Sequence, residues 1–172
     1  MSMLVFIILF ILLGTLAWGS LLAAPWVPTL QAQRNLLIDN LDIGGKAIIY
    51  DLGCGSGSIL FAFADRYPNA KCIGYDVALL PLGIGWLRKL RSPKKYKNVS
   101  LKFGNFFNRS FADADLVVSF LMQKAYVKFI SKLNNELKPG AMVAIEAWPL
   151  PDKHPLKIIR GEKLVSWYVY EW

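Results

Sequence analysis

The sequence predicts an α/β fold: a mostly parallel sheet that ends in an antiparallel hairpin, preceded by one transmembrane helix. Three observations lead to this prediction. Strand and helix patterns alternate between residues 47 and 147, a glycine-rich turn at residues 51–57 joins the first strand to a helix, and an uncharged apolar run occupies residues 3–24. Such alternation is typical of parallel strands connected by helices that cover both faces of the sheet.

The apolar run is the first element along the chain. Residues 3–24 contain no charged side chain, and about 20 such residues in a helix cross the hydrocarbon core of a bilayer. A cleaved signal peptide is an alternative, because Leu22–Ala24 would suit a cleavage site, but Met1–Met3 offers no Lys or Arg. A buried core helix would be an unusual addition to this fold. We therefore predict a retained membrane anchor at residues 3–24 and one domain at residues 25–172.

The predicted elements of the domain follow from apolar periodicity and from turn residues. Pro25 and Pro28 break any helix after the anchor, and residues 42–46 form a turn rich in glycine. Apolar residues at helical or strand spacing then predict a helix at 30–41, a strand at 47–51, a helix at 58–67, a strand at 71–76, a helix at 79–90, strands at 99–103 and 115–121, a helix at 124–137 and a strand at 142–147.

The end of the chain departs from this alternation. Residues 156–160 and 164–170 have strand patterns, and the short turn 161–163 between them predicts a hairpin. With this hairpin the sheet has seven strands.

The turn after the first strand predicts a ligand site. Gly53, Gly55 and Gly57 occupy alternate positions, which lets the backbone turn sharply and approach a ligand, and the next helix points free N–H groups at it. Dinucleotide folds use a different spacing, G-x-G-x-x-G. The acid Asp51 stands two residues before the first glycine. This segment resembles motif I of the class I S-adenosylmethionine-dependent methyltransferases, which have a Rossmann-like fold; another nucleotide binder or a degenerate site is the alternative.

The resemblance implies S-adenosyl-L-methionine as cofactor and assigns roles to residues. Asp51 would help hold the methionine amino group, Asp76 at the end of the next strand would take the ribose hydroxyls, and Asn105, where many members have Asp, would accept from the adenine amino group. Phe106 would pack on the adenine or belong to the core. The implied cofactor-binding residues are Asp51, Gly53, Cys54, Gly55, Gly57, Asp76, Val77, Asn105 and Phe106.

Three segments narrow the resemblance further. The anchor leads directly into Trp26–Thr29, motif I follows one short helix, and Ala147–Pro151 precedes the aromatic last strand. This arrangement resembles the small membrane-anchored protein-lysine methyltransferases whose mitochondrial members modify the ATP synthase c-subunit and the adenine nucleotide translocase. Those members usually have Tyr at the place of Trp26 and a second acid at the place of Ser56.

The narrower resemblance implies N-methylation of lysine side chains of a membrane or membrane-associated protein. A small-molecule or lipid methyltransferase at the membrane, and a cofactor-binding protein without catalysis, are the alternatives. The candidate substrate mouth comprises Trp26, Pro28, Thr29 and Phe120. No residue stands out as a general base, and the Asn-Pro-Pro-Tyr signature of amide and adenine N-methyltransferases is missing from the sequence.

Charge and composition set further expectations. The net charge is +8, and basic residues concentrate between Arg88 and Lys97, which suits a solvated face, anionic lipid headgroups or, without any supporting motif, nucleic acid. Two cysteines and the single His154, expected in an exposed loop, make a disulfide framework and a metal site improbable. Because the cofactor is made in the cytosol, the domain is expected to face it. The sequence predicts no oligomeric state.

Overall fold

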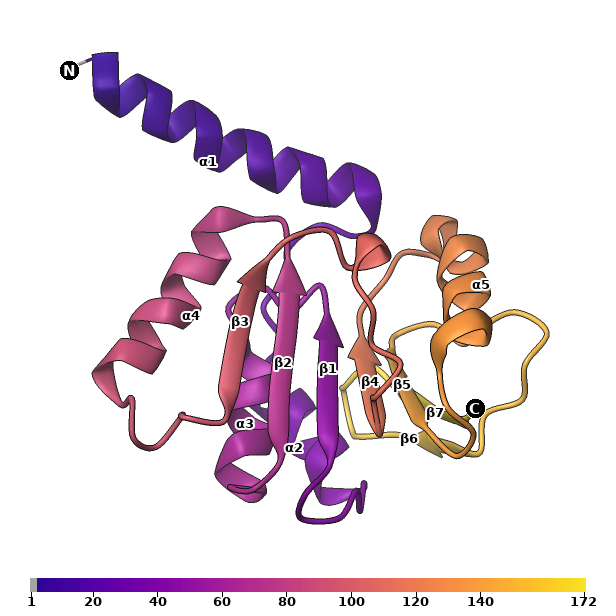
Figure 1. Cartoon of the computed structure of the whole chain (residues 1–172). Coiled ribbons are helices and arrows are strands. Elements are labelled where there is room, and N and C mark those ends of the chain that lie inside the picture. Colours follow the sequence, from indigo (N-terminus) through magenta and orange to yellow (C-terminus); the bar gives the residue numbers. More distant parts are fainter. Residues whose placement is uncertain (1–2) are drawn as a thin grey trace.

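The computed structural model describes residues 3–172 and contains one seven-stranded sheet (Figure 1). The strand order is β3-β2-β1-β4-β5-β7-β6. The strands are β1 (Ile48–Leu52), β2 (Lys71–Asp76), β3 (Val99–Phe103), β4 (Leu116–Ser119), β5 (Met142–Glu146), β6 (Lys157–Ile159) and β7 (Trp167–Glu171). The helices are α1 (Met3–Leu22), α2 (Gln31–Asp39), α3 (Ser58–Arg66), α4 (Leu79–Arg91) and α5 (Tyr126–Glu136), with 3-10 turns η1 (Phe106–Asn108) and η2 (Gln123–Ala125).

The pairing of the strands confirms the predicted mixed sheet. Strands β1 to β5 pair in parallel, whereas β7 is antiparallel to both β5 and β6. The strand order reverses between β1 and β4. Strands β2 and β3 lie on one side of β1, whereas β4 and β5 lie on its other side. Ligands of open α/β sheets bind outside the carboxyl ends of the strands at such a reversal.

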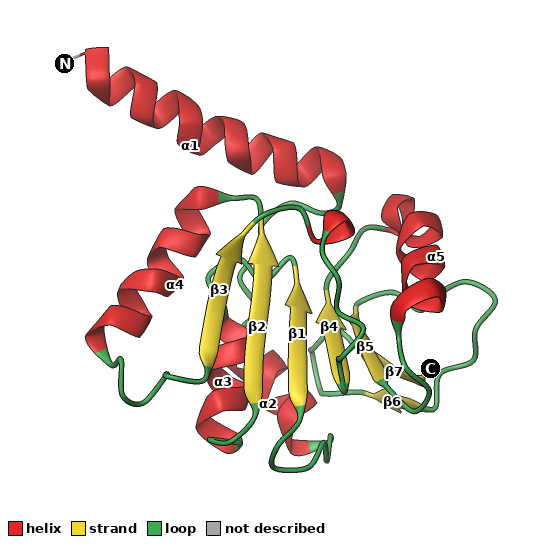
Figure 2. Cartoon of the chain, viewed as in Figure 1, coloured by secondary structure: helices red, strands yellow, loops and turns green. Residues whose placement is uncertain are grey.

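Both faces of the sheet are covered, as the alternation predicts (Figure 2). One buried cluster fills the space between the sheet and α2, α3 and α4, and includes Leu37, Phe61 and Leu82. The cluster on the other face is built with α5 and includes Phe129 and Leu133. Helix α1 lies outside these two layers and crosses above the carboxyl ends of β1, β2 and β3 (Figure 1).

Most boundaries differ from the sequence prediction by one or two residues, and two of the differences have physical reasons. The predicted strand 115–121 ends at Ser119, because the chain there leaves the sheet edge and turns over the carboxyl ends of the strands. The last strand begins at Trp167 instead of residue 164. Before it, the backbone oxygen of Val165 accepts a hydrogen bond from Gln33 Nε2 at 2.7 Å, which ties this segment to α2 and takes it out of the ladder.

Gly57→Ala is expected to destabilise the fold by about 1–2 kcal/mol, since L residues avoid left-handed backbone. Gly57 precedes α3 with φ +72°, and a Cβ there would lie 2.7 Å from Leu101 Cδ2. For a chain of this size the thermal unfolding midpoint in detergent should fall by about 2–8 °C. Gly45→Ala is the matched control, because open space surrounds Gly45 and its φ is not positive. Equal midpoints for the two variants would contradict this account of Gly57.

Candidate active site

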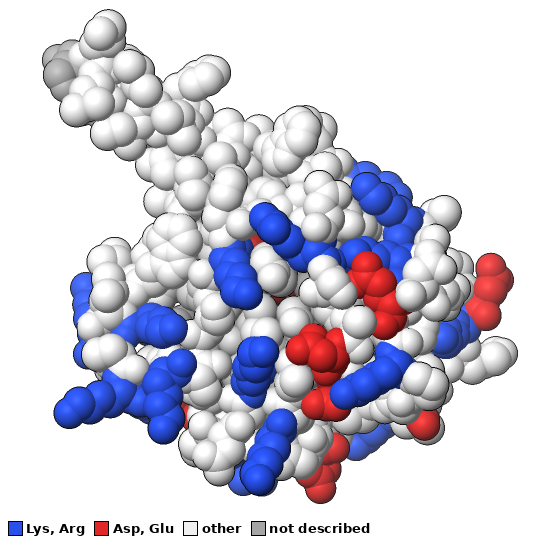
Figure 3. All heavy atoms as spheres, viewed as in Figure 1, with Lys and Arg blue, Asp and Glu red and all other residues white. Residues whose placement is uncertain are grey.

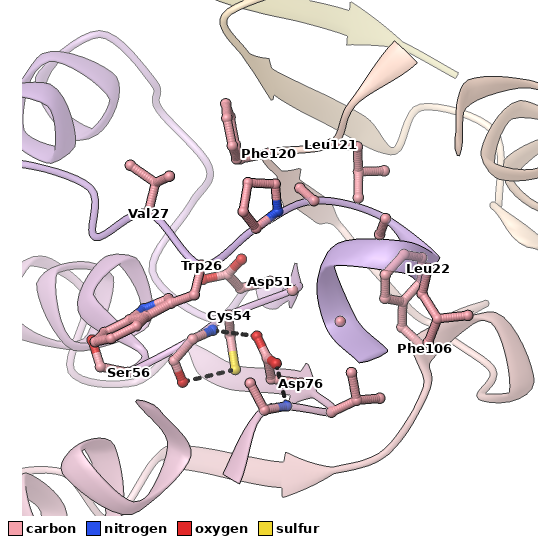
Figure 4. Close-up of a pocket in the computed structure, with 18 of the residues that line it drawn as sticks. Leu22, Trp26, Val27, Asp51, Cys54, Ser56, Asp76, Phe106, Phe120 and Leu121 are labelled. Atoms are coloured by element: carbon pink, nitrogen blue, oxygen red, sulfur yellow. Dashed lines mark hydrogen bonds between the residues drawn. The ribbon is translucent and has the colours of Figure 1, made fainter. Parts of the chain in front are cut away.

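A cavity of about 870 Å³, measured out to its open mouth, lies at the carboxyl ends of β1 and β2. The loops after β1, β2, β3 and β4 form its wall together with the segment that follows α1. In Figure 4, Trp26 and Ser56 lie on one side, Leu22 and Phe106 on the other, and Asp51 and Asp76 between them. The predicted site residues that line it are Trp26, Pro28, Thr29, Asp51, Gly53, Cys54, Gly55, Asp76, Val77, Asn105, Phe106 and Phe120.

Gly57 is the one predicted site residue outside the lining of this cavity. It packs toward Leu101 and Phe61, on the side of the turn that faces the core. A glycine is therefore favoured at this position because the backbone is left-handed where α3 begins.

Gly55 brings the turn into contact with the indole of Trp26. A Cβ at Gly55 would lie 2.8 Å from both Cδ1 and Nε1 of Trp26, and the φ of +52° also disfavours a side chain. The backbone N–H groups of Gly53 and Cys54 donate to the oxygen of Tyr75 at 2.9 and 3.1 Å, which fastens the turn to β2. The turn thus presents bare backbone to the cavity beneath an aromatic side chain.

Asp76 is held in place by backbone donors at both carboxylate oxygens. Oδ2 accepts from Gly55 N at 2.7 Å and Oδ1 accepts from Ala78 N at 2.8 Å. Burial raises the pKa of Asp76, and the N–H groups of Ala78, Gly55 and Val77 oppose that increase. This carboxylate connects the glycine turn to the start of α4 and still faces the cavity.

Asp51 is buried more deeply than the half-buried Asp76 and is 3% exposed. Its pKa lies well above the usual range because of burial first, and then because of the charges of Asp76 and Glu146. Among the described residues the ion pairs are Lys95–Asp65, Lys132–Glu136 and Lys138–Asp115, and none of these lies at the cavity. The site therefore holds acids that no protein cation neutralises, and a bound cation would favour their ionised form.

The adenine-side residues Asn105 and Phe106 also have roles within the fold. Asn105 Oδ1 accepts from Phe107 N at 3.0 Å and so caps η1, which leaves one lone pair of that oxygen and the NH₂ group for a ligand. Phe106 is buried and its ring lies 4.3 Å from that of Phe107 and 6.4 Å from that of Phe129. It lines the cavity and belongs to the core at the same time.

Neither cysteine is bonded to another, and both are buried. Burial, with the charges of Asp51 and Asp76 as smaller causes, raises the pKa of the Cys54 thiol, so that Cys54 lines the cavity as a neutral side chain. His154 is exposed in a loop before β6, as the sequence predicts.

Helix α1 contributes to the cavity in a way the sequence does not reveal. Leu16, Gly19, Leu22 and Ala23 all line it. The helix is fastened by Thr15 Oγ1, which accepts from Leu79 N at 3.2 Å, and the oxygen of Ala23 accepts from Met122 N at 3.1 Å. An uncharged, mostly apolar run carries no signal that its last turns pack against a domain.

A second cavity of about 550 Å³ adjoins the first, because Val27, Pro28, Thr29 and Phe120 line both. Glu146, the last residue of β5, lines only the second one. Burial raises its pKa to about 7, and a hydrogen bond from the Thr29 side chain opposes the increase. Sequence reasoning missed this acid, although its position at the carboxyl end of an apolar strand was the available signal.

Glu146→Gln is expected to make stability less dependent on pH. Burial raises the pKa of Glu146 from 4.5 to about 7. Between these values the folded chain holds a proton that the unfolded chain has lost, so stability falls as the pH rises through this range, by about 3 kcal/mol at most. Because glutamine cannot ionise, the Gln variant should lack this part of the fall in stability with rising pH.

Thermal unfolding midpoints in detergent, measured from about pH 5 to about pH 8, test this expectation. Any slope left in the variant belongs to Asp51 and Asp76, whose pKa values burial also raises. The exposed Glu162, replaced by Gln, is the control and should keep the full slope. An equally steep decline in Glu146→Gln would refute the assignment.

The fold and the site together define the class of protein. A seven-stranded sheet closed by an antiparallel hairpin, a glycine turn after β1 and acids at the ends of β1 and β2 are the features of a class I S-adenosylmethionine-dependent methyltransferase. Residues 51–157 match the family described as the ANTKMT methyltransferase domain, which is more than half of the 172-residue chain. The chain belongs to this methyltransferase family.

Relatives agree with this class. The chain is 27% identical over 138 residues to a protein-lysine N-methyltransferase of Saccharolobus islandicus, covering 80% of this chain and 85% of that protein. It is 31% identical over 121 residues to an uncharacterized protein of Rickettsia prowazekii, covering 66% of this chain and 48% of that protein. Among solved structures, an RNA methyltransferase of Salinibacter ruber in complex with S-adenosyl-L-homocysteine shares the fold, with a TM-score of 0.75 and 19% identity over 84% of this chain and 93% of that one.

Proposed function

We propose that this protein transfers a methyl group from S-adenosylmethionine to lysine side chains of a membrane or membrane-associated protein. The observation that carries the proposal is a cavity with unpaired buried acids that joins a second, mostly apolar cavity through a shared wall. The first cavity suits a cationic nucleoside cofactor and the second suits the long side chain of an acceptor. The similarity to an archaeal protein-lysine N-methyltransferase over most of both chains supports the same substrate class.

The residues of the first cavity match the chemistry of the cofactor. Buried carboxylates without protein cations favour a positively charged ligand with an amino group and with hydroxyl donors. We assign Asp51 to the amino group, Asp76 to the ribose hydroxyls, and Asn105 with Phe106 to the adenine. The backbone of the glycine turn, formed by Gly53, Cys54 and Gly55, would lie directly against the ligand. Val77 would pack against its ribose.

Bound S-adenosylmethionine supplies a methyl group on a positively charged sulfur, which is already a good leaving group. The chain therefore has to align and desolvate the acceptor amine, and alignment alone lowers a barrier by about 7–11 kcal/mol. A lysine has an unperturbed pKa near 10.4, and a partly apolar surrounding favours its neutral form. We assign this surrounding to the shared wall, where Pro28, Thr29 and Phe120 line both cavities and Trp26 covers the glycine turn.

The membrane part of the proposal rests on α1. Its 20 residues form a helix about 30 Å long, which matches the hydrocarbon core of a bilayer. No side chain of α1 is buried, and Phe10 and Leu21 are 78% and 74% exposed. The turns of α1 from Thr15 onward pack on the domain, so the apolar residues before Thr15 would enter the bilayer and hold the cavity at the membrane surface. We propose that the domain lies on the cytosolic side, where the cofactor is made.

The basic residues of α4 contribute less to this proposal. Lys and Arg are scattered over the domain face in Figure 3, whereas α1 is uncharged. Several basic side chains near the end of α4 have partners within the chain: Arg88 lies over the ring of Phe61, Lys89 donates to the oxygen of Val99, and Lys95 pairs with Asp65. A solvated basic face is therefore favoured over a lipid-binding one.

The distribution of transferred label tests the substrate class. The full chain in its own membranes, incubated with methyl-labelled S-adenosylmethionine, should place acid-stable label in membrane proteins, and Asp76→Ala should abolish it. Label confined to the lipid extract would move the assignment to a lipid or small-molecule substrate. Cofactor binding without any transfer would indicate a binding protein, and either result would overturn the proposal.

A further inference from the structure

Within the proposed lysine transfer, the second cavity has one charged group in its floor. Glu146 is 7% exposed and has no ion-pair partner among residues 3–172. The side chain of Thr29 interacts with its carboxylate and opposes the rise of its pKa. A nearly buried carboxylate in an apolar cavity is unfavourable unless a cation or a proton joins it.

We propose that the second cavity is the acceptor channel and that Glu146 binds the ε-ammonium group of the incoming lysine and takes its proton. This inference rests on the proposed function and deepens it, because it names the group that recognises the acceptor. The acceptor class that follows is a primary amine at the end of a flexible apolar chain.

The walls of the channel suit the methylene groups of a lysine. Val27, Leu30, Phe120, Leu164 and Val165 contribute apolar surface. The ring of Phe120 packs against that of Trp148, with ring centroids 5.7 Å apart. The charged end of such a side chain would meet Glu146, and the shared wall of Pro28, Thr29 and Phe120 would bring it next to the cofactor cavity.

Thr29 and Gln33 keep this arrangement in place. The side chain of Thr29 interacts with Glu146, and Gln33 donates to the oxygen of Val165, which bonds α2 to the loop before β7. Lys163 also lines the cavity, from the turn between β6 and β7, without a salt bridge to Glu146. It places a cation at the cavity without neutralising the acid.

The proton step balances within the pair. The ammonium N–H bond breaks and its proton passes to a carboxylate oxygen of Glu146, which leaves a neutral amine with a free electron pair and a neutral carboxylic acid. The amine nitrogen then forms the bond to the methyl carbon, while the electron pair of the carbon–sulfur bond stays on sulfur. The acid releases its proton to water after the product leaves.

Two charged residues lie near Glu146. The charge of Glu146 contributes to the raised pKa of Asp51, and Lys163 of the β6–β7 turn lines the same cavity. The pKa of about 7 is dominated by burial, with the Thr29 hydrogen bond opposing it. The ionised form is needed to receive a proton, so kcat/KM should rise with pH through this value.

Glu146→Gln in the full chain, assayed with Nα-acetyl-lysine amide and with a lysine peptide, tests the inference. We expect the KM for the amine to rise at least tenfold, the limb of the pH profile near 7 to disappear, and the dissociation constant for S-adenosylmethionine to stay within about twofold. Glu162→Gln, the same chemical change one residue from Lys163 but outside the cavity, should behave as the wild type.

Glu146→Asp keeps the experiment decisive if the Gln variant does not fold. It retains the charge with a shorter reach, so the limb near pH 7 should remain while the KM rises. Unchanged KM and pH profile in either folded variant, with lysine still methylated by the wild type, would overturn this inference and leave the proposed function standing. A wild type that binds cofactor but methylates no lysine would overturn both.

Discussion

Asp76→Ala is expected to weaken S-adenosylmethionine binding about 100-fold. Hydrogen bonds to an ionised carboxylate contribute about 1.5–3 kcal/mol each, and the loss of a ribose pair approaches the upper value. The backbone bonds from Gly55 and Ala78 to this carboxylate are lost as well, so the glycine turn also loses its fixed position. Isothermal titration calorimetry of the full chain in detergent measures the change.

Two controls separate binding from folding in the Asp76 experiment. Asp65→Ala removes an acid that forms a surface pair with Lys95, and should leave cofactor affinity unchanged. The substitution leaves the N–H groups of Gly55 and Ala78 without their acceptor, so the thermal midpoint of Asp76→Ala without cofactor should fall by about 2–8 °C, and a single cooperative transition shows that the variant still folds. Equal affinity in wild type and Asp76→Ala would refute the ribose assignment.

Removal of α1 is expected to release the protein from membranes and to weaken cofactor binding about tenfold. The helix supplies the apolar run, and Leu22 and Ala23 line the cofactor cavity. Full burial of a leucine side chain is worth about 1.5–3 kcal/mol, and the half-buried Leu22 should contribute about half of this, which is at most about one order of magnitude in affinity.

Two deletions distinguish these contributions of α1. A chain without residues 3–24 should lose both membrane retention and part of its affinity. A chain without residues 3–14 keeps the lining residues Leu16 to Ala23 but has too short an apolar run to span a bilayer, so it should lose retention alone. Carbonate extraction measures retention, and calorimetry measures affinity. Full affinity without residues 3–24 would contradict the role of α1 in the cavity.

The sequence predicted those parts of the site that depend on local pattern. Gly53 and Gly55 mark a turn because their positive φ angles favour glycine, and Asp51 and Asp76 lie at the ends of neighbouring parallel strands. Parallel strands bring their carboxyl ends to one edge, so residues 25 positions apart in the chain meet at one cavity. These inferences need no knowledge of side-chain packing.

Contacts between segments that are distant in the sequence could not be predicted from local patterns. The position of Glu146 beside the acceptor wall depends on the register in which β5 pairs with β4, where Ser119 stands opposite Ile145. A single acid at a strand end usually indicates a solvated residue, and its burial follows from the loop that carries Leu164 and Val165 over it. The docking of α1 likewise depends on partners more than 50 residues away, such as Leu79.

The most direct test is to identify the methylated residue. Membrane proteins labelled by the full chain and methyl-labelled S-adenosylmethionine are hydrolysed in acid, and the amino acids are separated beside methyl-lysine standards. The account predicts label that co-migrates with ε-N-methylated lysine and that is missing with Asp76→Ala. Label in any other amino acid, or in lipid with none in the hydrolysate, would contradict lysine transfer.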